Sequence, residues 1–272
     1  MMSMKKEYFV KEDSIVRQIW GKGDTILVIF AGASAEFALN KAVDWLYFTG
    51  QLPADPLGRL FSTVSYARRI VFAEKAEAFQ AIDTINHIHA QVESARGHQI
   101  PDWAYRDVLF MLIDYSIRAY ELMERELTRS EKQEVFEVFF RVGERMNLKG
   151  LPRNLERYEL MRNTHLEQNL ENAALTRDLF LQYRKHLGIV RYRLLLETQT
   201  LVVPEKVREM MRFRRFSLLH PLIGFYKLSR SIKLDWLLKS IILPSKYKHE
   251  IRELDVPDKR PHRFSKPERS GV

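Results

Sequence analysis

Two polar signatures lie within stretches whose other residues are typical of packed helices. The first is RLFST at residues 59–63, just after the helix-start signal Asp55-Pro56, and the second is INHIH at residues 85–89. They supply a guanidinium, a hydroxyl and an imidazole beside residues that should face a core. An anionic, metal-containing cofactor such as haem requires groups of this kind.

Helical geometry separates the two histidines of the second signature. The helical neighbours of His89 are apolar: Ile82, Ile85 and Val92. The helical neighbours of His87 are polar: Gln80, Asp83 and Gln91. Residues two apart on a helix point in nearly opposite directions. We therefore expect His89 to face inward and His87 to face water, which argues against a metal site made of both.

Arg59 and Thr63 are four residues apart and share one helix face, which continues through Ser62 and Tyr66. Two interpretations are open. The pair could be a surface arginine with a threonine bonded to its own helix. Alternatively, it is a polar wall that holds carboxylates or a small oxygen ligand, because arginine offers a fixed fork of donors to anionic oxygens.

Asp114 follows an apolar block, VLFMLI at residues 108–113, and we expect it to be at least partly buried. A buried carboxylate needs a partner. Arg118, four residues later, is one candidate, and Arg59 is another. The third is the second nitrogen of His89, whose orientation a carboxylate would fix. The sequence does not choose among these three.

Other chemistries lack the residues that they need. Cysteine is absent, which excludes disulfides, thiolate-ligated haem and cysteine-bound iron–sulfur clusters. No His-Glu-x-x-His zinc motif is present. None of the eight histidines has an acidic residue three positions before it, which disfavours a di-iron carboxylate bundle.

The elements that must position these side chains are helices. Asp55-Pro56, Pro101-Asp102 and the capping box TRSE at residues 128–131 each predict a helix start. An apolar run over residues 25–39 predicts a buried helix, and a long helix is expected over residues 171–198. Hairpin signals of the Asn-Gly or Asp-Gly type are absent. The predicted fold is all-α.

Domain organisation follows from composition. We expect an N-terminal segment at residues 1–19, one helical domain at residues 20–244, and a polar, flexible tail at residues 245–272 that contains three prolines. Residues 199–203 could form a short strand, but no sheet is predicted from them. The most apolar run is too short to cross a membrane, and the amino terminus lacks the apolar block of a signal peptide. The expected location is the cytoplasm, with peripheral attachment to a membrane left open.

The chain carries a net charge of +9, and the segment at residues 204–244 contributes strongly, with nine Lys/Arg against three acidic residues. A solvated basic face is the first interpretation. An anionic membrane surface is the second, because the basic residues alternate with aromatic and aliphatic ones. Nucleic acid is not expected as a partner, since no recognition motif accompanies the charge.

The order of five motifs resembles one known family. The motifs are DPLGRLFST (55–63), VFAEKAEA (71–78), IN followed by HA (85–90), LIDYS followed by AYE (112–121), and RVGE (141–144). They are similar to the catalytic domain of the ER-bound oxygenase mpaB and rubber oxygenase (latex clearing protein) family. The resemblance runs from about residue 20 to 165, with a looser similarity to residue 244.

This resemblance implies an all-helical, globin-like core that holds haem b. It implies that His89 is the proximal iron ligand and that Arg59 and Thr63 belong to the haem pocket. We expect Arg59 and Thr63 to be catalytic, and Ser62, Tyr66 and Asp114 to line the cofactor with them. The reaction would use O2 on an apolar substrate, isoprenoid or lipid-like. Where rubber oxygenases carry a lysine three residues after the arginine, this chain has Ser62, which leaves the distal side open and argues against rubber as the substrate.

Two hypotheses of other classes stay open at the level of sequence. One is a non-catalytic helical protein that binds lipid or a membrane surface through the basic segment at residues 204–244. The other is a carrier of an apolar ligand that has kept the cavity without the metal. Neither the oligomeric state nor a redox partner can be inferred.

Overall fold

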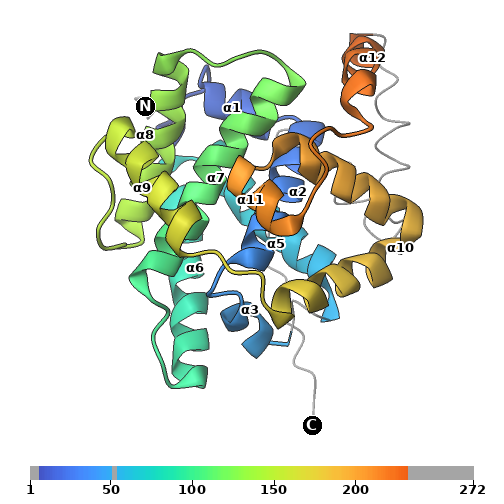
Figure 1. Cartoon of the computed structure of the whole chain (residues 1–272). Helices are drawn as coiled ribbons and strands as arrows, with labels where there is room; N and C mark the ends of the chain where they lie inside the picture. The colour runs from blue at the N-terminus through green and yellow to red at the C-terminus, as the bar shows by residue number, and fades with distance from the viewer. Residues whose placement is uncertain (1–5, 51–53, 232–272) are drawn as a thin grey trace, which may run out of the picture.

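A computed structural model describes residues 6–50 and 54–231, and in this part of the chain every regular element is a helix (Figure 1). The helices are α1 (Ile15–Trp20), α2 (Gly23–Leu39), α3 (Asp44–Phe48), α5 (Pro56–Phe72), α6 (Lys75–Arg96), α7 (Asp102–Met123), α8 (Arg129–Arg145), α9 (Leu155–Gln168), α10 (Ala174–Val202), α11 (Glu205–Met211) and α12 (His220–Ser231). Two isolated β-bridges are the only strand-like pairings among the described residues. The all-α prediction is confirmed, whereas the globin-like character of the core stays a prediction.

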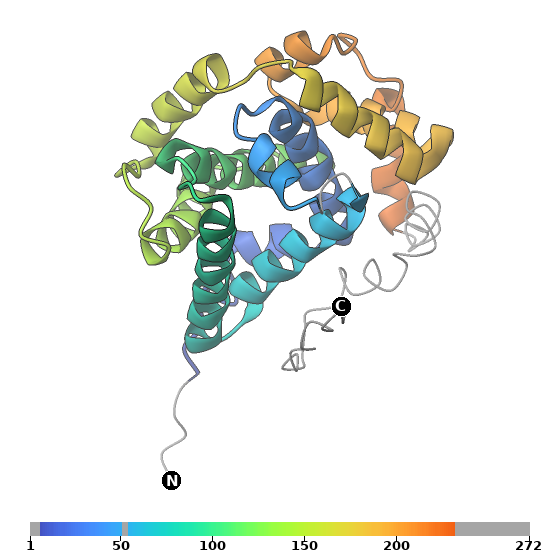
Figure 2. The same ribbon diagram turned by 90° about the horizontal axis from the view of Figure 1, so that it is seen from below.

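The apolar run at residues 25–39 forms α2, which packs against α7 and α10 near the middle of the molecule (Figure 2). Most of its residues are buried on all sides, so the prediction of a core helix is confirmed. Helices α2 and α7 approach each other closely at Gly32, where a Cβ atom would collide with the ring of Tyr115. The acidic residue of the run, Glu36, is fully buried. A charge in such a position requires partners from other helices.

The predicted helix starts are found where the capping residues indicated. The Asp55 side chain accepts a hydrogen bond from the backbone N–H of Gly58, and Pro56 is the first residue of α5. Thr128 and Glu131 form the reciprocal capping box of α8. Each of these caps depends only on residues within one turn of each other, which explains why they were predictable.

The short strand that the sequence left possible at residues 199–203 is not formed. The residues that could have formed a short strand continue α10, which extends to Val202, and a left-handed φ of 72° at Gly188 breaks the helix internally. Side-chain packing on one face outweighs the β preference of branched residues there. In the apolar block of α7, Val108 is 40% exposed, whereas Leu109, Phe110, Met111 and Ile113 are buried.

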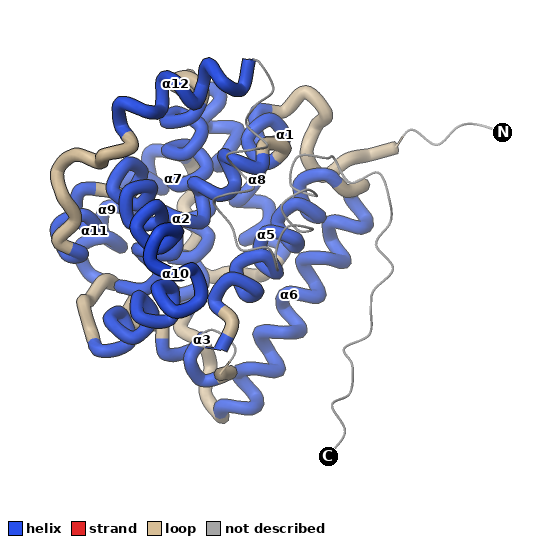
Figure 3. Tube along the Cα trace, turned by 90° about the vertical axis from the view of Figure 1, so that its right-hand side faces the viewer, coloured by secondary structure: helices blue, strands red, loops and turns tan. Residues whose placement is uncertain are grey.

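Helices α5 and α6 carry the two polar signatures and lie alongside each other (Figure 3). Their pairing is therefore the feature of the fold that brings the guanidinium and the imidazole into one region. No helix within residues 6–50 and 54–231 is long and apolar enough to cross a membrane. The predicted tail at residues 245–272 lies outside the described residues.

Candidate functional site

Arg59 lies in the first turn of α5, where the Asp55 cap and Pro56 fix the start of the helix. Its side chain is largely buried, and its guanidinium Nη1 donates to Thr63 Oγ1 at 3.4 Å. The Thr63 hydroxyl in turn donates to the Arg59 carbonyl oxygen at 3.1 Å. No carboxylate forms an ion pair with Arg59 in the described part of the chain. Among the described residues, Arg59 is thus a largely buried cation whose side-chain hydrogen-bond acceptor is a hydroxyl.

His89 lies in the second half of α6 with its ring half-buried against Tyr105 of α7, the two ring centroids being 5.1 Å apart. The Nδ1 atom is buried and has no hydrogen-bond partner among the described residues. Buried side-chain nitrogens are usually hydrogen-bonded. An unpartnered imidazole nitrogen is a donor atom available to a metal or to a bound ligand.

Electrostatics keep this imidazole neutral. Burial, followed by the positive charge of Arg59, lowers the pKa of His89 to about 4, while Glu93 acts in the opposite direction. Burial also lowers the pKa of Arg59, an effect that Tyr66 partly offsets. The Arg59 effect on His89 indicates that the two side chains lie close enough to interact. At neutral pH His89 therefore keeps the free electron pair that metal ligation needs.

The sequence analysis did not predict two further residues of this site, Glu93 and Tyr105. The Tyr105 hydroxyl donates to Glu93 Oε1 at 3.0 Å, and the same oxygen accepts the backbone N–H of Ile100 at 2.8 Å. Burial and this hydrogen bond raise the pKa of Tyr105. Glu93 comes four residues after His89, so its position on the same face could have been found by the helical period. No pattern in the sequence indicated that Tyr105 of α7 would contact His89.

The other predicted site residues are more dispersed. Tyr66 is half-buried near Arg59, whereas Ser62 is exposed. His87 is exposed as expected, with its Nε2 3.0 Å from the side-chain amide of Gln91. Asp114 is bonded to Arg118 at 2.9 Å and to Arg162 at 2.8 Å. The local candidate Arg118 is thus confirmed as a partner of Asp114, and neither Arg59 nor His89 is bonded to it in the described residues.

A second polar cluster, also missed from the sequence, lies between α2, α7 and α9. We call it the buried ion network; its charged members are Glu36, Asp107, Asp114, Arg162 and His165. Arg162 donates from Nη1 and Nη2 to the two oxygens of Glu36, and its Nη2 also reaches Asp114. The Tyr115 hydroxyl donates to Glu36 Oε2 at 2.9 Å.

The network closes on itself, because its donors and acceptors bond to one another. It resembles a structural tie between three helices more than a binding site. Among the described residues, moreover, no group of three or more His, Asp or Glu side chains is arranged to hold a metal ion. The reactive features of the site are the unpartnered His89 nitrogen and the cation of Arg59, whose charge acts on it.

Comparison with known proteins identifies the family of the chain. The family described as "ER-bound oxygenase mpaB/B'/Rubber oxygenase, catalytic domain" matches residues 18–228, well over half of the chain. The chain belongs to this family. Neither the curated proteins nor the solved structures yield a significant match.

Family membership classes the chain as an oxygenase-type enzyme and confirms the resemblance seen in the motifs. The matched range contains Arg59, Thr63 and His89, and it extends further toward the carboxyl terminus than the strongest motif resemblance did. An enzyme is thereby favoured over the two non-catalytic hypotheses.

Proposed function

We propose that this oxygenase is haem-dependent, with haem b bound through His89, and that it uses O2 to oxidise an apolar substrate of isoprenoid or lipid-like character. The observation that carries the proposal is the buried Nδ1 of a neutral imidazole without a partner. Haem brings four nitrogen ligands of its own, so a single histidine suffices to hold the iron. The absence of cysteine from the chain is compatible with histidine ligation.

Arg59 supports the same proposal. Its cation is largely buried without an ion-pair partner in the described residues. An isolated buried charge is costly. The propionate carboxylates of haem are suitable partners, since the guanidinium fork matches carboxylate geometry. Tyr66 and Thr63 would be further hydrogen-bonding groups of the pocket. The proposal leaves out Ser62, which is exposed, and Asp114, which is bonded to Arg118 and Arg162.

When bound, haem would supply the redox chemistry that activates O2. The protein's own residues would then do three things. His89 would donate its electron pair to the iron, with Tyr105 limiting its rotation. Arg59 would hold and orient an anionic group. Glu93, near His89, would increase the electron density on the imidazole, because a neighbouring carboxylate favours positive charge on the ring.

Reconstitution of the purified protein with haem tests the proposal. We expect a Soret band that shifts in the variant His89→Ala. Haem affinity should fall by at least the roughly 10–100-fold that the loss of a residue supporting a metal ligand costs. The control is His87→Ala, two residues away and exposed, which should leave the spectrum unchanged. A spectrum that is the same in both variants, or no band in the wild type, would remove the haem assignment.

Substrate class is tested separately, by O2 consumption in the presence of haem. Short isoprenoids and unsaturated fatty acids should stimulate uptake, whereas polar substrates of similar size should not. Arg59→Met should lower the rate through weakened cofactor retention, so the bound haem must be measured in the same samples. Uptake unchanged by any apolar compound would contradict the proposed substrate class.

A further inference from the structure

The segment after α11, residues 212–227, has an unusual composition; we call it the docking segment. It contains four basic residues, Arg212, Arg214, Arg215 and Lys227, and no acidic residue. It comprises the turn that leaves α11 and most of α12, at the outer edge of the molecule (Figures 1 and 3). All charged side chains of this peripheral segment are therefore positive.

The same segment exposes large apolar side chains. The exposed fractions are 73% for Phe216, 66% for Leu218, 53% for Leu222 and 72% for Phe225. Single exposed apolar residues are ordinary, but a group of four within ten residues marks an interaction surface. Leu222 and Phe225 are three residues apart on α12 and thus share one face of the helix.

Hydrogen bonds hold this surface in place. The carboxylate of Glu197 accepts from Ser217 Oγ at 2.9 Å and from the backbone N–H of Leu218 at 2.7 Å, and it pairs with Arg214. These contacts attach the turn to α10. Phe216 and Leu218, on either side of the buried Ser217, consequently point away from the protein on a fixed backbone.

Two other side chains attach α12 to the core helices. The Tyr226 hydroxyl donates to Asp24 of α2 at 3.1 Å, and Lys227 Nζ donates to the carbonyl oxygen of Glu124 at 3.2 Å. This attachment leaves Leu222 and Phe225 on the outer face. The helix is therefore attached to the core and still exposes two large apolar side chains to solvent.

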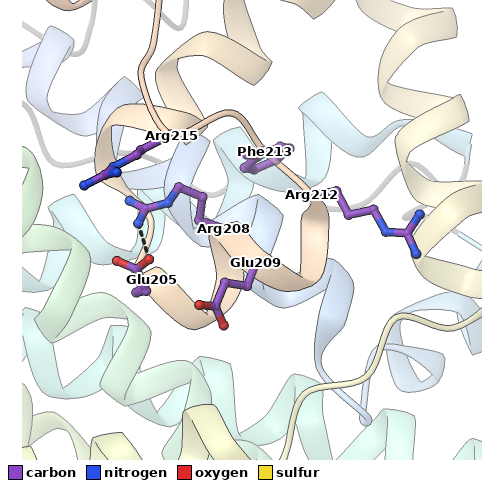
Figure 4. Close-up of a pocket in the computed structure, with 6 residues that line it drawn as sticks. All are labelled: Glu205, Arg208, Glu209, Arg212, Phe213 and Arg215. Carbon is purple, nitrogen blue, oxygen red and sulfur yellow. Dashed lines mark ion pairs between the residues drawn. The ribbon is translucent and has the colours of Figure 1, made fainter.

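Arginines lie on α11 and on the turn that follows it (Figure 4). A surface hollow of about 560 Å³ at α11 is lined by Glu205, Arg208, Glu209, Arg212, Phe213 and Arg215. Arg208 is paired with Glu205, but Arg212 and Arg215 have no acidic partner among the described residues. The Arg215 guanidinium lies over the ring of Phe216, 5.6 Å from its centroid. Two uncompensated cations thus adjoin the apolar surface.

We propose that the docking segment binds the surface of an anionic phospholipid bilayer. The apolar side chains of Phe216, Leu218, Leu222 and Phe225 would enter the boundary between headgroups and acyl chains, and Arg212 and Arg215 would contact lipid phosphates. Nucleic acid would match the charge but would leave the aliphatic side chains exposed to water. This surface is distinct from the Arg59 and His89 site, so the proposal does not depend on haem.

Vesicle flotation with the full-length protein tests the proposal. Binding to vesicles of phosphatidylcholine with phosphatidylserine should be strong and should fall with added salt, whereas pure phosphatidylcholine should bind weakly. The double variant Phe216→Ser/Phe225→Ser should reduce partitioning by roughly tenfold or more. Its matched control is Leu160→Ser, since Leu160 of α9 is 60% exposed but lies elsewhere.

Charge is tested by Arg212→Glu/Arg215→Glu against the control Arg153→Glu, an exposed arginine in the connection between α8 and α9. The first pair should weaken binding to anionic vesicles by roughly tenfold, whereas the control should change it by less than about twofold. Thermal unfolding of every variant checks that each is folded. No binding by the wild type, or equal losses in test and control variants, would overturn the proposal.

A site-specific probe distinguishes lipid from other occupants of this surface. Because the chain has no cysteine, Leu222→Cys provides a single attachment point for an environment-sensitive fluorophore. Its emission should be typical of water in the free protein and should shift to the blue with anionic vesicles. A probe already shielded without vesicles would assign the surface to a protein contact and refute lipid docking. Shielding that increases with protein concentration would identify that contact as one with a second copy.

Discussion

His165 Nε2 lies 2.8 Å from Glu36 Oε1, with both side chains buried. On the other side of the ring, Nδ1 lies 2.7 Å from Asp107 Oδ2. A carboxylate accepts hydrogen bonds and has no proton to donate, so both ring nitrogens must donate. The imidazole of His165 is therefore the protonated, positively charged form, which helps Arg162 to balance the carboxylates of the buried ion network.

The first prediction concerns the pH dependence of this contact. Burial lowers the pKa of His165, but the hydrogen bonds to Asp107 and Glu36 outweigh burial and raise it above its usual 6.5. The stabilisation is therefore complete below about pH 6.5 and is lost as the pH rises through the folded-state pKa. Urea unfolding of the wild type and His165→Gln between pH 5.5 and 9 should show a difference that shrinks with increasing pH. A difference independent of pH would show that His165 is neutral in the fold.

The second prediction concerns Arg162, which is 4% exposed and forms ion pairs with Glu36 and Asp114. Arg162→Met should lower the free energy of unfolding by about 3–5 kcal/mol, because Glu36 would be left buried without its main counter-charge. Denaturant titration at pH 7 measures the change. In Arg129→Met, an exposed ion pair with Glu156 is lost instead, and little change is expected. A small effect at both positions would show that solvent reaches Glu36.

The third prediction concerns the close approach of α2 to its neighbours. In Gly32→Ala, the new methyl group would collide with the ring of Tyr115 and with Val202. Over-packing of this kind should lower the free energy of unfolding by about 1–3 kcal/mol despite the better helix propensity of alanine. Gly224→Ala is the control, since nothing lies within 4 Å of a Cβ at that position of α12. It should be neutral or stabilising, and a loss as large as that of Gly32→Ala would exclude collision as the cause.

The fourth prediction concerns the interaction between Arg59 and His89. The pKa of His89 is lowered to about 4 by burial and by Arg59. Arg59→Met removes the charge but keeps most of the buried volume, so the pKa should rise part of the way toward 6.5. Titration of the His89 ring protons by NMR measures the shift in the protein without added haem. Ser62→Ala, an exposed change on the same helix, should leave this pKa where it is.

A consequence for stability follows from the same pKa. A histidine that stays neutral in the fold takes up its proton only after unfolding, so the unfolded chain binds more protons than the folded one as the pH falls below 6.5. The His89 contribution therefore destabilises the fold as the pH falls from about 6.5 toward 4. In Arg59→Met the loss of stability should begin at the same pH, about 6.5, as in the wild type. It should end at a higher pH, because the folded-state pKa of His89 is then higher.

The sequence alone was enough to place several helices and to orient the two signature histidines. Asp55 and Thr128 cap their helices through residues within one turn, and the apolar stripe that includes Ile85 is a property of α6 alone. Such signals are local, and the 3.6-residue period makes them readable. For the same reason, Arg118 could be named as a partner of Asp114, four residues away.

Only the tertiary structure decided which charges meet across helices. Glu36 and Arg162 are 126 positions apart in the chain, and no periodicity links α2 to α9. The contact of Tyr105 with His89 likewise depends on how α7 lies against α6. Helix packing has several allowed geometries, and side-chain shape selects among them. The sequence therefore determined that His89 faces inward, and the packing determined that its nitrogen has no partner there.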